Sequence, residues 1–260
     1  MWIGTSVRGP AVALLVAVAM GGACAKPDPD AQADLDRKAR AHYAVAMEHL
    51  REGRVALSIR ELQAAEQVTP DDPWVQLALG EAYRVRGKEE EAERHLRRAI
   101  SLRPGFQPAL LNLSALYIQL ERYEEAVSIS DGLLDNATFP VPWKALTNRG
   151  YALMKMGRPD EARESLLGAL EYHESYWPAI LDIAILDSEQ GRNLEALRGL
   201  ERVLELDPGS LPVSEAHYRM ALIYISLGNR DRAVHHLEIA AQPSGGQWGK
   251  RSQDYLQRLR

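Results

Sequence analysis

The chain has 260 residues, of which 46% are hydrophobic and 26% are charged, and its formal net charge is −5. This apolar content excludes an intrinsically disordered chain, and the acidic balance argues against nucleic acid as the main partner. The sequence contains one cysteine, so no disulfide can form within the chain.

The first 23 residues have the features of a secretory signal peptide. Arg8 supplies positive charge near the amino terminus, the ten residues 11–20 are all apolar, and residues 21–23 are small. A bilayer core of about 30 Å requires roughly 20 apolar residues in a helix, so this run is too short to span a membrane. We therefore predict that residues 1–23 are a signal peptide.

The single cysteine, Cys24, directly follows the small residues. This position resembles the cleavage site of bacterial lipoproteins, where the thiol receives a diacylglycerol and becomes the first residue of the mature chain. The resemblance implies a membrane anchor at Cys24. Because Ala25 rather than aspartate comes next, it also implies a location at the periplasmic face of the outer membrane. Cleavage by an ordinary signal peptidase after Ala23 or Ala25 is the alternative.

Residues 24–37 are rich in proline, aspartate and alanine. Such a composition is typical of a short linker, so we predict that this segment is a flexible tether between the lipidated Cys24 and a folded body that begins at residue 38.

Residues 73–106 carry the clearest pattern in the folded part. Gly80 and Ala92 are small, as a close crossing of two antiparallel helices requires, while Tyr83 and Leu96 are large enough to fill the space beside it. The spacing resembles the tetratricopeptide repeat (TPR) pattern W-x2-L-G-x2-Y…A-x3-F…P. The resemblance implies a hairpin of two helices.

The same frame recurs about every 34 residues. It covers residues 39–72, 73–106, 107–140, 143–176, 177–210 and 214–242, and residues 247–260 resemble a capping helix. Because one repeat cannot bury its apolar face alone, stacked repeats must provide the core. We therefore predict an all-α fold over residues 38–260, a right-handed superhelical solenoid of about six TPR helix pairs plus a C-terminal capping helix. Within the third repeat, Ser114 and Glu121 stand where glycine is usual.

Two extra residues separate the third and fourth repeats and fall within the sequence FPVP, residues 139–142. Proline lacks an N–H group and restricts the residue before it, so this connection should be extended. Residues 130–162 resemble the centre of the type IV pilus secretin pilotins, the PilF/PilW/Tgl group. The matching residues are Asp135, Phe139, Pro140, Pro142, Ala145, Asn148 and Gly150.

This second resemblance implies a function. It suggests a non-enzymatic outer-membrane lipoprotein, a type IV pilus biogenesis factor that binds secretin subunits and promotes their localisation and multimer assembly. The alternative is a general TPR scaffold lipoprotein of another envelope machine, either outer-membrane barrel assembly or a peptidoglycan enzyme complex.

The first helices of such repeats line a concave surface, and the frame places mostly apolar side chains there. We predict a partner-binding groove formed by Tyr43, Met47, Leu50, Leu77, Arg84, Leu111, Ile118, Tyr151 and Met154. Apolar stripes on a surface often mark the binding site of a partner. The alternative is that individual residues of this set pack against neighbouring helices.

No motif for catalysis or metal binding is present. The sequence lacks a His-Glu-x-x-His motif and a glycine-rich phosphate loop. Its acid-rich runs, such as EEEAERHLRR, have the i,i+4 charge pairs of a solvated helix. We therefore expect neither enzymatic activity nor a cofactor or metal ion, and protein partners rather than nucleic acid.

Overall fold

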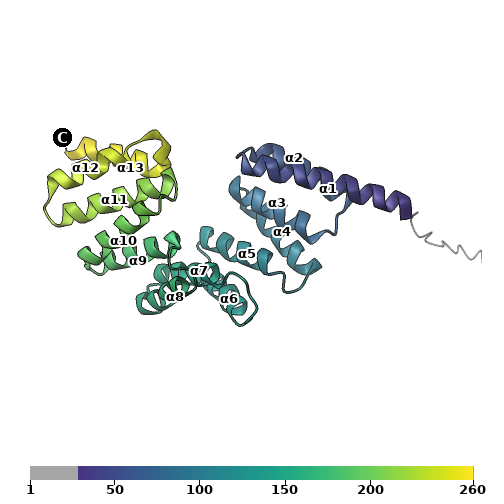
Figure 1. Ribbon diagram of the computed structural model, residues 1–260, viewed down its shortest axis with the longest axis horizontal. Helices are drawn as coiled ribbons and strands as arrows, with labels where there is room; N and C mark the ends of the chain where they lie inside the picture. The colour runs from purple at the N-terminus through teal and green to yellow at the C-terminus, as the bar shows by residue number, and fades with distance from the viewer. Residues whose placement is uncertain (1–28, 260) are drawn as a thin grey trace, which may run out of the picture.

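The protein is represented by a computed structural model that describes residues 29–259 (Figure 1). The predicted signal peptide and Cys24 lie outside the described residues. The helices are α1 (Pro29–Arg51), α2 (Val55–Val68), α3 (Pro73–Val85), α4 (Glu89–Leu102), α5 (Gln107–Gln119), α6 (Tyr123–Leu134), α7 (Pro142–Lys155), α8 (Pro159–Tyr172), α9 (Trp177–Glu189), α10 (Asn193–Glu205), α11 (Ser210–Ser226), α12 (Arg230–Ala240), the short 3₁₀ helix η1 (Pro243–Gly245) and α13 (Gly246–Leu259). No helix in this range combines the length and the apolar character needed to cross a bilayer.

The thirteen α-helices of the described range pack as successive hairpins, which confirms the predicted all-α repeat fold. Each helix contacts the next one in the chain, and α13 packs against α11 and α12 at the C-terminal end. From α3 to α11, the first helix of each pair also contacts the first helix of the next pair. Because elements on the inside of a curved stack lie closest together, these odd-numbered helices line the inner face of the arch in Figure 1.

Helix α1 is longer than the sequence pattern predicted. Residues 29–37, expected in the flexible tether, are helical and extend α1 beyond the second helix of its pair (Figure 1). Pro29 and Asp30 are compatible with a first helical turn, where proline needs no N–H partner and an acid favours the helix dipole. Ala39, about two and a half turns further along the helix, is buried. Proline and aspartate thus begin a helix here rather than interrupting one.

Close helix crossings explain the small residues in each repeat. A β-carbon at Gly80 would lie 2.6 Å from Leu96 Cγ, and one at Gly150 would lie 2.7 Å from Leu166 Cγ. In the third repeat Ser114 replaces the glycine, and the facing leucine is replaced by Ser130. The two serine hydroxyl oxygens lie 3.0 Å apart and are fully buried.

The turn inside the third repeat has the same backbone as its glycine-containing equivalents. Gly87 and Gly157 have φ angles of 70° and 72°, and Glu121 has a φ angle of 58°. Glutamate therefore occupies the left-handed region, which costs an L-residue about 1–2 kcal/mol. The repeat geometry overrides this local preference.

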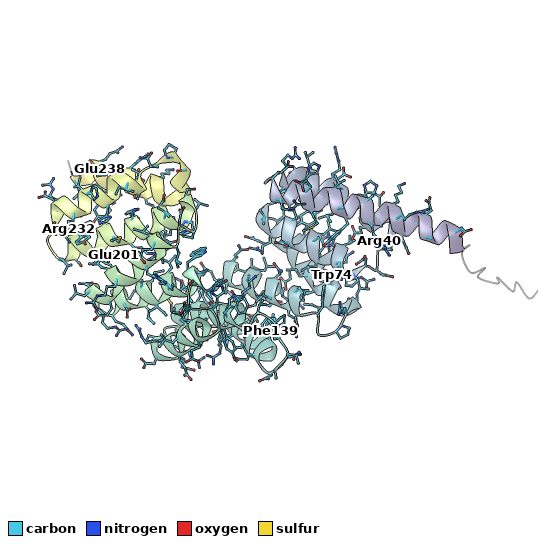
Figure 2. The ribbon with its side chains drawn as sticks, in the orientation of Figure 1. Arg40, Trp74, Phe139, Glu201, Arg232 and Glu238 are labelled. Atoms are coloured by element: carbon cyan, nitrogen blue, oxygen red, sulfur yellow. The ribbon has the colours of Figure 1, made fainter. Side chains whose placement is uncertain are left out.

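The connection between α6 and α7 is an ordered turn with a buried anchor. Asn136 Oδ1 accepts hydrogen bonds from the Thr138 N–H at 3.0 Å and from its hydroxyl at 2.8 Å, an arrangement that closes a local turn. Phe139 is 7% exposed and packs with Leu133 of α6 and Ala145 of α7. Figure 2 shows Phe139 beside these helices, at the base of the arch. The two extra residues of this connection thus place an aromatic side chain between two repeats.

Candidate docking groove

The inner face contains a cavity of about 480 Å³ in the C-terminal half of the arch. Four odd-numbered helices, α7, α9, α11 and α13, contribute its walls. The lining residues are Tyr151, Met154, Lys155, Leu181, Asp182, Ile185, Glu189, Glu215, Arg219, Gln247, Trp248 and Arg251. Two of the predicted groove residues, Tyr151 and Met154, are therefore brought together in one concave site.

Asp182 is the most buried of the charged side chains that line this cavity. Asp182 on α9 is 8% exposed and forms no hydrogen bond or ion pair with any residue that the structure describes. Burial is the main cause that raises the pKa of Asp182, to about 8, and the nearby Glu215 carboxylate adds to the effect. Arg219 and Lys155 act in the opposite direction. The ionised form of a carboxyl group is costly in such a desolvated position, so the group stays protonated unless a cation pairs with it.

Several charged groups of the cavity lining already have partners. Arg219 donates two hydrogen bonds to Glu215 Oε1, at 2.8 and 2.6 Å. The guanidinium groups of Arg219 and Arg251 lie 5.2 and 4.8 Å from the centre of the Trp248 ring. These contacts engage Glu215, Arg219 and Arg251 with one another or with Trp248 and leave the buried Asp182 without a hydrogen bond.

Tyr151 also lines this cavity. The Lys155 ammonium group lies 5.2 Å from the centre of the Tyr151 ring, within the range of a cation–π contact. Burial raises the pKa of the Tyr151 phenol, and the carboxyl group of Asp182 is the next cause. The phenol and the carboxyl group therefore share one partly desolvated environment.

The N-terminal residues of the predicted groove occupy a different environment. Tyr43, Met47 and Leu50 of α1 are partly buried and pack against the core cluster formed with α2 and α3. Leu77 is 8% exposed and belongs to the adjacent core cluster. A substitution at Leu77 would consequently test core packing rather than partner binding.

The remaining predicted residues have mixed surroundings. Leu111 and Ile118 of α5 are partly buried against two separate core clusters. Arg84 is partly buried, and its Nε atom has no hydrogen-bond partner among the described residues. The structure does not bring these three residues into the C-terminal cavity.

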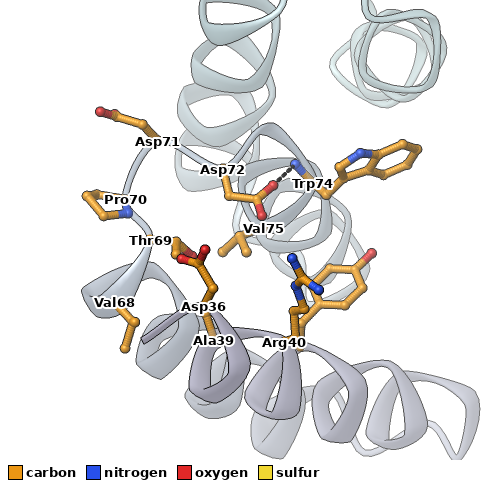
Figure 3. A pocket seen from close by; sticks show the side chains of 11 residues that line it. Asp36, Ala39, Arg40, Val68, Thr69, Pro70, Asp71, Asp72, Trp74 and Val75 are labelled. Atoms are coloured by element: carbon orange, nitrogen blue, oxygen red, sulfur yellow. Dashed lines mark hydrogen bonds between the residues drawn. The ribbon is translucent and has the colours of Figure 1, made fainter. Parts of the chain in front are cut away.

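A second cavity, of about 660 Å³, lies where α1 passes the loop between α2 and α3 (Figure 3). Tyr43 is the one predicted groove residue among those that line it. Its other walls include Asp36, Arg40 and Trp74, and Figure 2 shows Arg40 and Trp74 at this end of the arch. Asp72 Oδ1 accepts a hydrogen bond of 2.8 Å from the Trp74 N–H and so caps α3 (Figure 3).

Sequence reasoning missed Asp182, Arg219, Trp248 and Arg251. A signal for Asp182 was available, because it lies 34 residues after Asn148 and thus in the same register of the next first helix. The contribution of Trp248 and Arg251 depends on how α13 folds back against α11, which the repeat frame does not specify.

No three histidine, cysteine, aspartate or glutamate side chains gather as a metal site between residues 29 and 259. His217 and His236 approach each other with their Nδ1 atoms 2.9 Å apart. Burial, followed by the neighbouring imidazoles, lowers the pKa of His236 to about 4. This pair therefore links α11 and α12 as neutral rings.

Two solved structures have folds similar to this one. The crystal structure of PilW, described as a widely conserved type IV pilus biogenesis factor, is 21% identical and has a TM-score of 0.69; the match covers 77% of this chain and 90% of PilW. Pseudomonas aeruginosa pilF is 16% identical and has a TM-score of 0.66, with 85% and 99% covered. At these identities the likeness establishes the fold.

Sequence comparisons also indicate a repeat protein. The TPR repeat-containing protein YpiA of Bacillus subtilis is 26% identical over 134 residues, which are 52% of this chain and 31% of YpiA. The chain thus spans about a third of the length of this curated relative. Three tetratricopeptide repeat families match residues 43–105, 86–150, and 144–175 together with 214–240. With the paired helices and the crossings at Gly80 and Gly150, these matches establish that the chain is a tetratricopeptide repeat protein.

Proposed function

We propose that the protein is a non-enzymatic adaptor that supports assembly of a type IV pilus secretin at the outer membrane. The observation that carries this proposal is the match of the arch to nearly the whole length of PilW and P. aeruginosa pilF. The pilotin-like linker, with Phe139 buried between α6 and α7, supports the same assignment.

The proposed action needs no chemical step. Secretin subunits bind the inner face of the arch through a cavity that combines apolar walls with a few polar groups, a composition typical of binding sites. Subunits held close to one another at a membrane have a raised effective concentration, which favours their multimerisation.

The membrane anchor is a separate part of the proposal. Diacylglycerol on Cys24 adds about 0.8 kcal/mol for each buried methylene group, and two or more acyl chains give lasting attachment. Cys24→Ser should move the protein from the membrane fraction to the soluble fraction. A Cys24→Ser protein that stays with the membrane would show that acylation at this residue is not the anchor.

The function is tested in a deletion strain. Secretin multimers that resist heat and detergent should be lost when the gene is removed and restored by the wild-type gene on a plasmid. Unchanged multimers would contradict the proposal. A pull-down from detergent extracts then separates the alternatives, because recovery of barrel-assembly proteins or peptidoglycan enzymes in place of the secretin would identify a general envelope scaffold.

A further inference from the structure

We propose that the inner cavity binds a lysine or arginine side chain of the partner polypeptide, with the Asp182 carboxylate as its counter-ion. This inference deepens the proposed function, since it rests on the inner face being the partner-binding surface. It names the chemistry that the partner must present.

The position of the charges favours a cation over an anion. Asp182 is the most deeply buried charged group of the cavity, at 8% exposure, whereas Lys155, Glu189 and Arg251 are all exposed at the rim. The Glu215 carboxylate already accepts two hydrogen bonds from Arg219. A ligand group that reaches Asp182 therefore meets an acid that has no partner.

The walls suit the stem of a long basic side chain. Leu181 and Ile185 are buried on α9, and Met154 of α7 lies beside them in the cavity lining. Lysine and arginine place several methylene groups before their charge, so their stems contact apolar walls while the head reaches Asp182. A charge-assisted hydrogen bond at that depth is stronger than one in water.

Binding should be linked to loss of a proton from Asp182. The groups that face it are Lys155 and Tyr151 on α7, Tyr176 before α9, Glu189 on α9, Glu215 and Arg219 on α11, and Arg251 on α13. Because burial and Glu215 raise the pKa of Asp182 to about 8, the free site is largely protonated at neutral pH. A cation pairs with the ionised form, so its affinity should rise between about pH 6 and pH 8.

The test compares two small probes of nearly equal shape, N-acetylarginine amide and N-acetylcitrulline amide. Both lack terminal charges, and only the arginine probe has a charged side chain. Each is titrated into the full-length protein while the indole N–H resonance of Trp248 is followed by NMR. At about pH 8 the arginine probe should bind on the order of tenfold more tightly than the citrulline probe, the difference expected of a charge-assisted hydrogen bond. This ratio should shrink as the pH is lowered.

Two variants locate the effect. Asp182→Asn should reduce the arginine-to-citrulline ratio to about one, while Glu201→Gln, an exposed carboxylate on α10 outside the cavity lining, should keep it. Equal binding of the two probes by the wild type, or an unchanged ratio in Asp182→Asn, would overturn the assignment. The probe titrations do not depend on secretin assembly. The cation site at Asp182 and the proposed function can therefore be contradicted separately.

Discussion

Ser114 and Ser130 meet at the crossing of α5 and α6, where the neighbouring repeats pair glycine with leucine. The Ser114 hydroxyl lies 3.2 Å from the Ala126 carbonyl oxygen, and the Ser130 hydroxyl donates to the same oxygen at 2.8 Å. Both hydroxyl groups are buried, and their hydrogen bonds offset the cost of burial. The two serines thus form a matched pair, in which each small side chain leaves room for the other.

This pairing predicts a non-additive result. Ser130→Leu should place its side chain against Ser114 and lower the free energy of unfolding by about 1–3 kcal/mol, as overpacking does. The double variant Ser114→Gly with Ser130→Leu should recover most of this loss, because it recreates the Gly80–Leu96 arrangement. Urea unfolding followed by circular dichroism measures the free energy of unfolding of each single variant and of the double variant. If the losses caused by Ser114→Gly and Ser130→Leu simply add in the double variant, the crossing does not couple the two residues.

The Asp182 carboxyl group predicts a dependence of stability on pH. Its pKa in the folded protein, about 8, lies above its ordinary value of 3.8. The folded state therefore favours the protonated form, and this contribution to stability is complete below about pH 4 and is lost as the pH rises through about 8.

Asp182→Asn removes this titration. The melting temperature of the variant should exceed that of the wild type at pH 8, and the difference should narrow steadily towards pH 5. Differential scanning calorimetry of both proteins measures the difference, with Glu201→Gln, an exposed position on α10 outside the cavity, as the control. An offset that does not change with pH would show that Asp182 keeps its ordinary acidity in the folded chain.

At the scale of elements, the α6–α7 connection joins two halves of the arch through Phe139. Phe139→Ala should remove a buried anchor and lower the free energy of unfolding by about 3 kcal/mol. Pro140→Ala, at the exposed neighbouring position, should change it by less than about 0.5 kcal/mol. Thermal unfolding of the two variants measures both changes in stability. Equal losses of stability in Phe139→Ala and Pro140→Ala would mean that the prolines, rather than the Phe139 side chain, hold the connection.

The helix pairs could be predicted from the sequence because each repeats the same physical requirements. Gly80, Gly150 and the leucines that face them mark close crossings, and glycines such as Gly87 mark turns with positive φ. The start of α1 could not be predicted from the sequence, because the proline and aspartate content of residues 29–37 is equally typical of a linker. Tertiary contact at Ala39 favours the helix.

The candidate site was less predictable than the fold. The repeat frame identified the inner helices and the positions of Tyr151 and Met154, which do line the cavity. The repeat frame could not distinguish these cavity residues from Leu77. Leu77 lies on the equivalent helix face but is covered by neighbouring side chains. Burial in a solenoid depends on the curvature between repeats, and curvature arises from packing that a period does not encode.

At the scale of the whole molecule, the arch presents one inner surface built from odd-numbered helices and an outer surface built from even-numbered ones. The proposed binding surface for the partner is the inner one, near the C-terminal half. Tyr151 on α7 lines the cavity there. Tyr172 on α8 is 64% exposed on a second helix and provides a matched aromatic position outside it.

Site-specific photo-crosslinking in living cells distinguishes the two surfaces. The photoreactive amino acid p-benzoylphenylalanine replaces Tyr151 in one strain and Tyr172 in another, and adducts are identified with antibodies against the secretin. We expect a secretin adduct from position 151 and none from position 172. Absence of the adduct at 151, or equal adducts at both positions, would contradict the proposed binding surface.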